Sequence, residues 1–299
     1  MRYAPDDMPL GIKAQHIAVN AVSRALIGAV LLLPYAWRVR TMGWIMGRVI
    51  GPAAGYLRRA EAHVRYIMPH LPDAEITRIA RACLNNAGRT LIEIYSTSKF
   101  HNRQKGLDYG GPGFAAFQEA AAQGRPVILV GGHFGNYEAS RANLVDRGYA
   151  ISGLYRDLSN PYFNAHYTAA MEALNGPGFP QGRKGTAGFV RHLKTGGQLV
   201  LLFDQHFTGA PVLDFLGKPA HTAISAAELA LRYDALLIPY YAIRQPDGLT
   251  FVFEMETPVP HSDPLTMTQA MNDSLSARIR AHPEQWLWVA RRWRVDPDA

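Results

Sequence analysis

Residues 127–141 constrain the fold more than any other part of the chain. A short apolar run, residues 127–130, ends at Gly131 and Gly132, His133 follows at once, and Glu138 comes five residues later. This pattern predicts a buried strand, a tight turn and the first turn of a helix. Open α/β sheets bind ligands at the carboxyl ends of their strands. His133 is therefore the first candidate for a general base.

The rest of the chain predicts an α/β fold with a mixed, mostly parallel central sheet flanked by helices. Short apolar runs alternate with helical patterns after Pro126, and we expect strands at residues 127–130, 149–155, 198–203, 211–216, 236–244 and 250–255. The turn at residues 245–248 predicts an antiparallel pair at the sheet edge. Before this part lies a long helical pattern up to Ile94, for which Asp73 is the expected N-cap.

The N-terminal part has the composition of a membrane-associating region. Residues 25–37 are strongly apolar and lie between Arg24 and Arg38, but they are fewer than the roughly 20 residues that span a bilayer. Trp37, Trp44 and several arginines flank apolar patches, as in an interfacial helix. A buried hydrophobic hairpin is the alternative. We divide the chain into a helical membrane-associating region, residues 1–60, and a single α/β domain, residues 61–299.

The net charge and the cysteine content limit the partners and the kinds of site. The formal charge is +7, which suits nucleic acid, an anionic membrane surface or an acidic carrier protein. The single cysteine, Cys83, excludes an intrachain disulfide and a cysteine-based zinc cluster. It lies on the apolar face of a predicted helix, where we expect it to fill the core.

His133 and Glu138 can form an acid–base pair if one lies in the turn and the other in the first helical turn. A carboxylate that accepts a proton from one imidazole nitrogen leaves the other nitrogen to take a proton from a hydroxyl. In this arrangement Gly131, Gly132 and Gly135 would let backbone amides approach an oxyanion. The alternative is that His133 caps the helix and Glu138 is solvated.

Other reaction classes have less support in the sequence. It contains neither a Gly-x-Ser-x-Gly nucleophile elbow nor a phosphate-binding loop of the Gly-x-x-x-x-Gly-Lys-Ser/Thr type. His133 and Phe134 would crowd a dinucleotide pyrophosphate. His133, Asp204 and His206 are a conceivable metal set, but we expect no metal and no cofactor.

Several ordered motifs resemble those of the bacterial lipid A late acyltransferases (lauroyl/myristoyl acyltransferases), within the lysophospholipid acyltransferase superfamily. The likeness runs from about Tyr66 to Arg294. It rests on the His-x-x-x-x-Asp/Glu motif from His133 to Glu138, and on the segments at residues 154–157, 160–161, 183, 193–196, 204–205, 215–222, 283–286 and 291–293.

The resemblance implies an acyltransferase with the glycerolphosphate-acyltransferase-like fold. His133 would deprotonate an acceptor hydroxyl, which attacks the thioester of an acyl carrier protein or coenzyme A, and Glu138 would orient His133. The acyl thioester is a co-substrate, and no cofactor is implied. Substrate-binding roles fall on the matched positions Arg156, Arg183, Lys184, Asp204, Gly132, Gly135 and Asn136.

The resemblance also implies a lipid acceptor and a place on the membrane. The implied location is the cytoplasmic face of the bacterial inner membrane, with the protein peripheral or singly anchored, and no nucleic acid is expected as a partner. Arg291, Arg292 and Arg294, beside Trp286, Trp288 and Trp293, would anchor at the membrane interface or pack on the core.

Two departures from the family pattern concern the acceptor. Residues 166–172 lack the arginine usual after Asn160-Pro161, and Ala290 stands where the family has a histidine. A lipid A precursor is the expected acceptor. The alternatives are another lyso-amphiphile, such as a lyso-aminolipid or a lysophospholipid, and a non-catalytic lipid-binding protein.

Overall fold

The computed structural model describes residues 8–176 and 178–293, with the side chain of Arg183 excepted. The N-terminal part is helical, and its elements are α1 (Leu10–Leu31), α2 (Tyr35–Ile45), the π-helix η1 (Met46–Ile50), α3 (Gly51–Ala53), α4 (Tyr56–Ile67), α5 (Asp73–Ile94) and α6 (Thr97–Gln104). The later helices are α7 (Gly113–Ala122), α8 (Tyr137–Asp146), α9 (Pro161–Asn175), α10 (Arg183–Lys194), α11 (Ser225–Tyr233), α12 (Pro264–Ala281) and the 3₁₀ helix η2 (Pro283–Gln285).

A seven-stranded sheet forms the centre of the molecule, in the order β1-β9-β8-β2-β5-β3-β4. Its strands are β1 (Tyr109–Gly110), β2 (Val127–Gly131), β3 (Ile151–Tyr155), β4 (Phe179–Pro180), β5 (Gln198–Leu202), β8 (Leu236–Arg244) and β9 (Phe251–Met255). Strand β2 is parallel to both β8 and β5, whereas β9 is antiparallel to β8. The expected α/β fold with a mostly parallel sheet is therefore confirmed.

Strand β2 is buried on both faces, as its continuous apolar sequence predicts. Ile128 and Val130 pack on one face in a core that includes side chains of α4, α5, α10, α11 and α12. Val127 and Leu129 pack on the other face in a second core. Side chains of α1 and α2, among them Ile27 and Val39, belong to that second core, so the N-terminal helices share buried surface with the sheet.

Three local expectations need correction. Asp73 is not the N-cap of α5: it is the first helical residue, Pro72 occupies the cap position, and the Asp73 carboxylate instead pairs with Arg65 at 2.5 Å. The β8–β9 pair is not at the edge, because the two-residue β1 lies outside β9. The strand expected at residues 211–216 is β6 (Val212–Phe215), which forms a separate hairpin with β7 (Lys218–His221), a strand that we did not predict.

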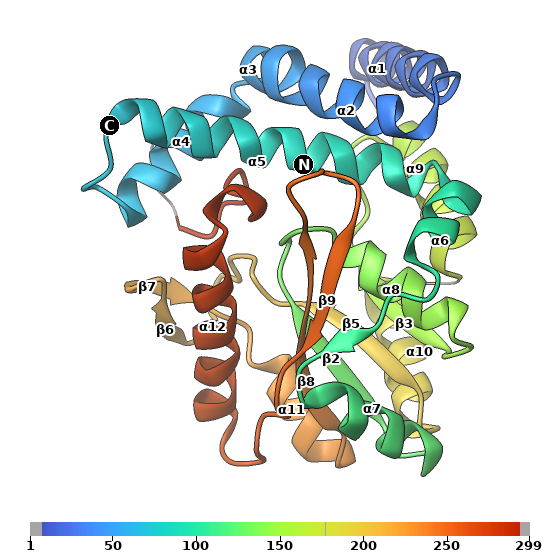
Figure 1. Cartoon of the computed structure of the whole chain (residues 1–299), viewed down its shortest axis with the longest axis vertical. Coiled ribbons are helices and arrows are strands. Elements are labelled where there is room, and N and C mark those ends of the chain that lie inside the picture. Colours follow the sequence, from blue (N-terminus) through green and yellow to red (C-terminus); the bar gives the residue numbers. More distant parts are fainter. Residues whose placement is uncertain (1–7, 177, 294–299) are drawn as a thin grey trace.

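Helix α5 lies across the end of the sheet at which β8 turns into β9, and α1–α3 lie on its far side (Figure 1). Glycine lets α2, η1 and α5 approach closely. A Cβ on Gly88 would lie 2.6 Å from both the carbonyl oxygen of Met42 and Cβ of Met46. On the other helix, a Cβ on Gly47 would lie 3.2 Å from the carbonyl oxygen of Arg81. This contact fixes the position of the N-terminal helices over the sheet.

Helix α1 is long and apolar enough to cross a membrane, by length and composition alone. It begins well before the apolar segment expected at residues 25–37, and that segment breaks at Pro34 between α1 and α2. Large apolar side chains are exposed on these two helices, among them Leu10, Val22, Trp37 and Trp44.

Substitution of Gly88 by alanine should destabilise the protein. Replacing glycine by alanine in a helix interior stabilises the helix by up to about 1 kcal/mol. Overpacking destabilises a core by about 1–3 kcal/mol, and here one of the clashing groups is backbone, which cannot move aside easily. We expect the clash to prevail and the melting temperature to fall by a few degrees in a calorimetric scan. Gly28→Ala in α1 is the matched control, because a Cβ there meets nothing within 4 Å. An unchanged melting temperature for Gly88→Ala would contradict the tight packing.

Candidate active site

The His133 side chain lies between the carboxyl ends of β2 and β5, where its partner is Asp204. Nδ1 of His133 is 2.8 Å from Oδ1 of Asp204, and the His133 backbone amide donates to Oδ2 over 2.7 Å. The Asp204 side chain is fully buried, and that of His133 is 18% exposed. The indole Nε1 of Trp286 donates a third hydrogen bond to the carboxylate, over 2.8 Å. With Nδ1 engaged by Asp204, Nε2 is the imidazole nitrogen left for a substrate.

The turn between β2 and α8 needs glycine at two positions. A Cβ on Gly132 would lie 2.9 Å from Oδ2 of Asp204 and 2.6 Å from a methyl of Leu275, so a side chain there would push the carboxylate away. Gly135 has φ +57°, and a Cβ on it would overlap the carbonyl oxygen of Ala242 at 1.9 Å. Both glycines thus support the turn that presents His133.

The electrostatics of the pair favour a protonated imidazole and an ionised carboxylate. Burial opposes the imidazolium, but the charge and hydrogen bond of Asp204, with a contribution from the charge of Glu138, outweigh it and raise the pKa of His133. Burial alone would raise the pKa of Asp204. The charge of His133 and the hydrogen bonds from His133 and Trp286 outweigh burial and lower this pKa below the usual value. Asp204 thus stabilises the charge that His133 acquires when it accepts a proton.

Glu138, the carboxylate expected to orient His133, has other partners in the structure. It is buried at the start of α8, where Nδ2 of Asn175 donates to its Oε2 and Arg141 lies 3.6 Å away. It acts on His133 through its charge, whereas the hydrogen bond to the imidazole comes from Asp204. The alternative, in which Glu138 is solvated and His133 caps the helix, is wrong, because Glu138 is buried and Asn136 is the N-cap of α8.

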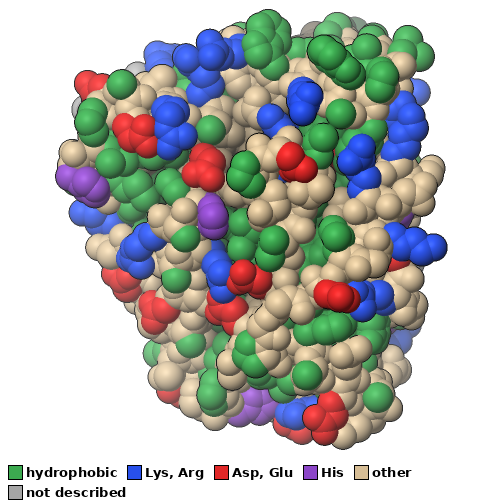
Figure 2. Space-filling model, in the orientation of Figure 1, with side chains coloured by type: hydrophobic (Ala, Val, Ile, Leu, Met, Phe, Trp, Pro, Cys, Tyr) green, Lys and Arg blue, Asp and Glu red, His purple; other side chains and the backbone are tan. Residues whose placement is uncertain are grey.

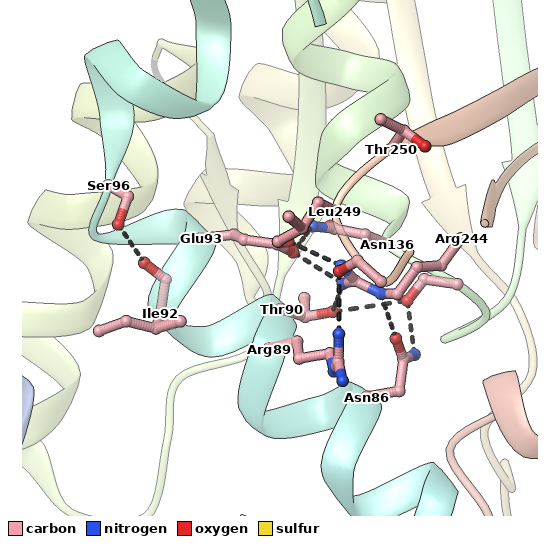
Figure 3. A network of polar contacts seen from close by, with 12 residues as sticks. Asn86, Arg89, Thr90, Ile92, Glu93, Ser96, Asn136, Arg244, Leu249 and Thr250 are labelled. Carbon is pink, nitrogen blue, oxygen red and sulfur yellow. Dashed lines mark hydrogen bonds and ion pairs between the residues drawn. The ribbon is translucent and has the colours of Figure 1, made fainter. Parts of the chain in front are cut away.

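A network of polar contacts holds the motif against α5 and β8 (Figure 3). Oδ1 of Asn136 accepts from the Glu138 amide, and its Nδ2 donates to Glu93 over 2.7 Å. The Glu93 carboxylate also accepts two hydrogen bonds of 2.7 Å from the Arg244 guanidinium, and all three side chains are buried. The side-chain oxygen and the side-chain nitrogen of Asn136 are therefore both hydrogen-bonded within the protein.

The backbone amides of the turn are engaged as well. The Gly135 amide donates to the carbonyl oxygen of Gln285, and the Asn136 amide to that of Ala242. The His133 amide is taken by Asp204. Of the amides that we expected at an oxyanion, that of Gly135 is thus directed into the protein.

Two cavities meet at His133. One, of about 370 Å³, lies along β3 and α9, and we call it the strand cavity. The other, of about 270 Å³, lies against α5, and we call it the helix cavity. Four residues line both cavities, namely His133, Tyr137, Leu158 and Tyr167. Burial raises the pKa of Tyr137 and of Tyr167 well above the usual value, so both phenols remain neutral beside the imidazole.

The basic residues predicted from the motifs lie near the strand cavity to differing extents. Arg156 is exposed and lines it. Lys184 is exposed in the first turn of α10, which follows the lining residue Gln181. The predicted role of the Arg183 side chain falls outside the described part of the chain. Four further residues were not predicted, because spacing along the sequence carries no sign of their contacts: Tyr137 and Tyr167 line the cavities beside His133, and Arg141 and Asn175 contact Glu138.

The aromatic tail packs on the core rather than on the surface. Trp286, Trp288, Trp293 and Arg292 are all buried, and Arg292 donates to the carbonyl oxygen of His221 over 2.6 Å. Of the remaining predicted interface residues, Arg291 is exposed and Arg294 lies outside the described residues. Cys83 is buried in α5, as expected. Within the described ranges, no three His, Cys, Asp or Glu side chains come together as a metal site.

Comparison with known proteins places the chain in a family. A lipid A biosynthesis acyltransferase of Haemophilus influenzae is 23% identical over 273 residues, which cover 89% of this chain and 84% of that protein. A lipid A biosynthesis lauroyltransferase of Escherichia coli K12 is 28% identical over 193 residues, 62% of each protein. The family model described as bacterial lipid A biosynthesis acyltransferase matches residues 14–295. With its motif histidine placed at the carboxyl edge of the sheet, the chain belongs to the bacterial lipid A biosynthesis acyltransferase family and is an acyltransferase.

Proposed function

We propose that the protein transfers a fatty acyl chain from a thioester donor, on acyl carrier protein or coenzyme A, to a hydroxyl of a lipid A precursor. The observation that carries the proposal is the buried Asp204–His133 pair, which leaves one imidazole nitrogen at the junction of two cavities. A general base at that junction can act on an acceptor in one cavity and a donor in the other. The names of the two relatives support the acceptor.

In the proposed reaction, Nε2 of His133 removes the proton from the acceptor hydroxyl while the oxygen attacks the thioester carbonyl carbon. The tetrahedral intermediate collapses, the carbon–sulfur bond breaks, and the thiolate takes the proton back from the imidazolium. Asp204 holds the imidazole orientation and stabilises its positive charge during both steps. The transfer is direct and requires no cofactor, since the acyl donor is a co-substrate.

Each cavity suits one of the two substrates. The helix cavity is lined by Met46 of η1 and so lies toward the N-terminal helices, which suits a lipid that enters from the membrane. The strand cavity has the apolar Leu202, Val200 and Met171 in its walls and Arg156 beside them, which suits an acyl chain with an anionic carrier group. We assign the lipid acceptor to the helix cavity and the acyl chain of the donor to the strand cavity.

Membrane association is proposed for residues 1–60, with catalysis in residues 61–299. The exposed apolar side chains of α1 and α2, with Trp37 and Trp44, suit the interface of the bacterial inner membrane, at its cytoplasmic face. The net charge of +7 suits an anionic membrane surface.

His133→Ala should lower the acyl-transfer rate by about 10²–10⁴-fold, the usual contribution of a general base. The measurement is release of the donor thiol together with mass spectrometry of the acceptor lipid. His70→Ala, at an exposed position, is the control, and a thermal melt checks that both variants are folded. A folded His133→Ala enzyme with the wild-type rate would exclude His133 as the base.

Mass spectrometry of lipids from a deletion strain tests the acceptor. Loss of one acyl chain from lipid A, restored by the wild-type enzyme and not by His133→Ala, is the expected result. An unchanged lipid A with a change in another acylated lipid would favour the alternative acceptor class, a lyso-aminolipid or lysophospholipid.

Asp204→Asn should both slow the reaction and displace its pH profile. A general base must be neutral, so kcat/KM rises with pH through the pKa of His133, which Asp204 raises above 6.5. Without the carboxylate charge, burial prevails and lowers that pKa. The acidic limb of the profile should therefore move to lower pH, and the plateau should fall by about 10²–10⁴-fold. The exposed Asp273→Asn should change neither, and an unmoved limb in Asp204→Asn would contradict the pairing.

A further inference from the structure

An open groove of about 930 Å³ lies along α5, apart from the His133–Asp204 pair. The groove is bordered by η1, by the β8–β9 turn and by η2. Its described lining contains five arginines and one carboxylate, from Arg48, Arg78, Arg81, Arg89, Arg244 and Glu284. We call it the basic groove. Figure 2 shows Lys and Arg side chains together with large apolar ones over the upper part of this face, where Figure 1 places α1–α5.

Two of the five arginines pair with carboxylates, and three do not. Arg244 pairs with Glu93 and Arg78 with Glu75, each at 2.7 Å. Arg89 donates to Oδ1 of Asn85 and to the carbonyl oxygen of Gly248, both uncharged acceptors. Among the described residues, Arg48 and Arg81 make no ion pair. The groove therefore holds an excess of positive charge.

Arg81 has an unmet hydrogen bond. Its Nε is buried and has no acceptor within the described structure, an arrangement that is unfavourable for a charged donor. Guanidinium groups bind phosphate oxygens in a bidentate, charge-assisted manner. An anionic ligand with several acceptor oxygens would bind the guanidinium groups that line the groove and balance their charge.

The position of the groove indicates an amphiphilic ligand. Asn86 and Gln285 line both the basic groove and the helix cavity, so the two are adjacent, and the helix cavity leads to His133. Trp44 lines the groove and is 57% exposed, next to the exposed apolar side chains of α1 and α2. A ligand that fills both spaces has an anionic head, an apolar part and a hydroxyl within reach of His133.

We propose that the basic groove binds a phosphate group of the lipid acceptor, with Arg48 and Arg81 as its ligands. The proposal rests on the proposed function, because it concerns how the same acceptor is held while His133 acts on its hydroxyl. The phosphate fixes the headgroup, and the helix cavity receives the adjoining apolar part. Arg48 and Arg81 thereby contribute to acceptor binding and take no part in proton transfer.

The test compares the full-length enzyme with an Arg48→Gln/Arg81→Gln variant on a phosphorylated lipid acceptor and on the same lipid after phosphatase treatment. We expect the variant to raise KM for the phosphorylated acceptor by about tenfold or more, with kcat and the donor KM unchanged. Wild type should show the same rise when the phosphate is removed, and the variant should not distinguish the two lipids. Arg191→Gln/Arg232→Gln, which removes two exposed charges from α10 and α11, should behave as wild type.

The kinetic outcomes that overturn the proposal are an unchanged acceptor KM in the Arg48/Arg81 variant, or a rise in the donor KM alone. The second would mean that the groove docks the carrier of the donor. A thermal melt separates binding from structure: since Arg81 leaves a buried donor unmatched, the variant should be no less stable than wild type. A marked fall in melting temperature would assign these arginines to the fold.

A binding measurement keeps the inference separable from the catalytic proposal. Sedimentation with phosphatidylcholine vesicles, with and without phosphatidic acid, should show added binding to phosphatidic acid in wild type that the Arg48/Arg81 variant lacks. This binding result is independent of catalysis. If neither lipid is acylated, the proposed acceptor is wrong, but the binding of a lipid phosphate in the groove is still supported. Equal binding of phosphatidic acid by both proteins would overturn a lipid phosphate as the occupant.

Discussion

The buried carboxylate of Asp204 is the interaction on which the site depends. It lies without solvent at the end of β5 and accepts hydrogen bonds from the His133 amide, the His133 ring and the Trp286 indole. A buried charge is tolerated only when it is paired and hydrogen-bonded, so the turn after β2 and the C-terminal segment must both be in place around it. Gly132 allows the close approach of the turn, and β2–β5 pairing sets the register. The His133–Asp204 pair is thereby assembled from three distant parts of the chain.

Helix α5 connects this assembly to the N-terminal helices. On one side, Glu93 binds Arg244 and Asn136, and Asn86 donates to the carbonyl oxygen of Gly135 over 2.8 Å. On the other side, Gly88 contacts the backbone of α2. A buried ion pair is not by itself a source of stability, because desolvation offsets the attraction. Here it ties the cap of α8 to β8, and so fixes the start of the helix that follows His133.

The sequence predicted the sheet and the histidine because both are local signals. The apolar runs correspond to strands β2, β3, β5, β6, β8 and β9, and every end agrees within two residues. The partner of His133 was not predicted, since proximity in sequence favoured Glu138 whereas the pairing of β2 with β5 brings Asp204, 71 residues away, to Nδ1. Arg81 belongs to an ordinary helical pattern, and only the packing of η1 and the 245–248 turn against α5 makes a groove beside it.

The shared core of the N-terminal helices bears on how the enzyme folds and how it can be handled. Ile27, Val39 and Met42 pack in the same cluster as Ile92 of α5 and Leu129 of β2. A chain shortened to begin after these helices would leave that apolar surface exposed, and would also lose η1 from the basic groove and from the helix cavity. Solubility gained by truncation would thus come with a damaged core.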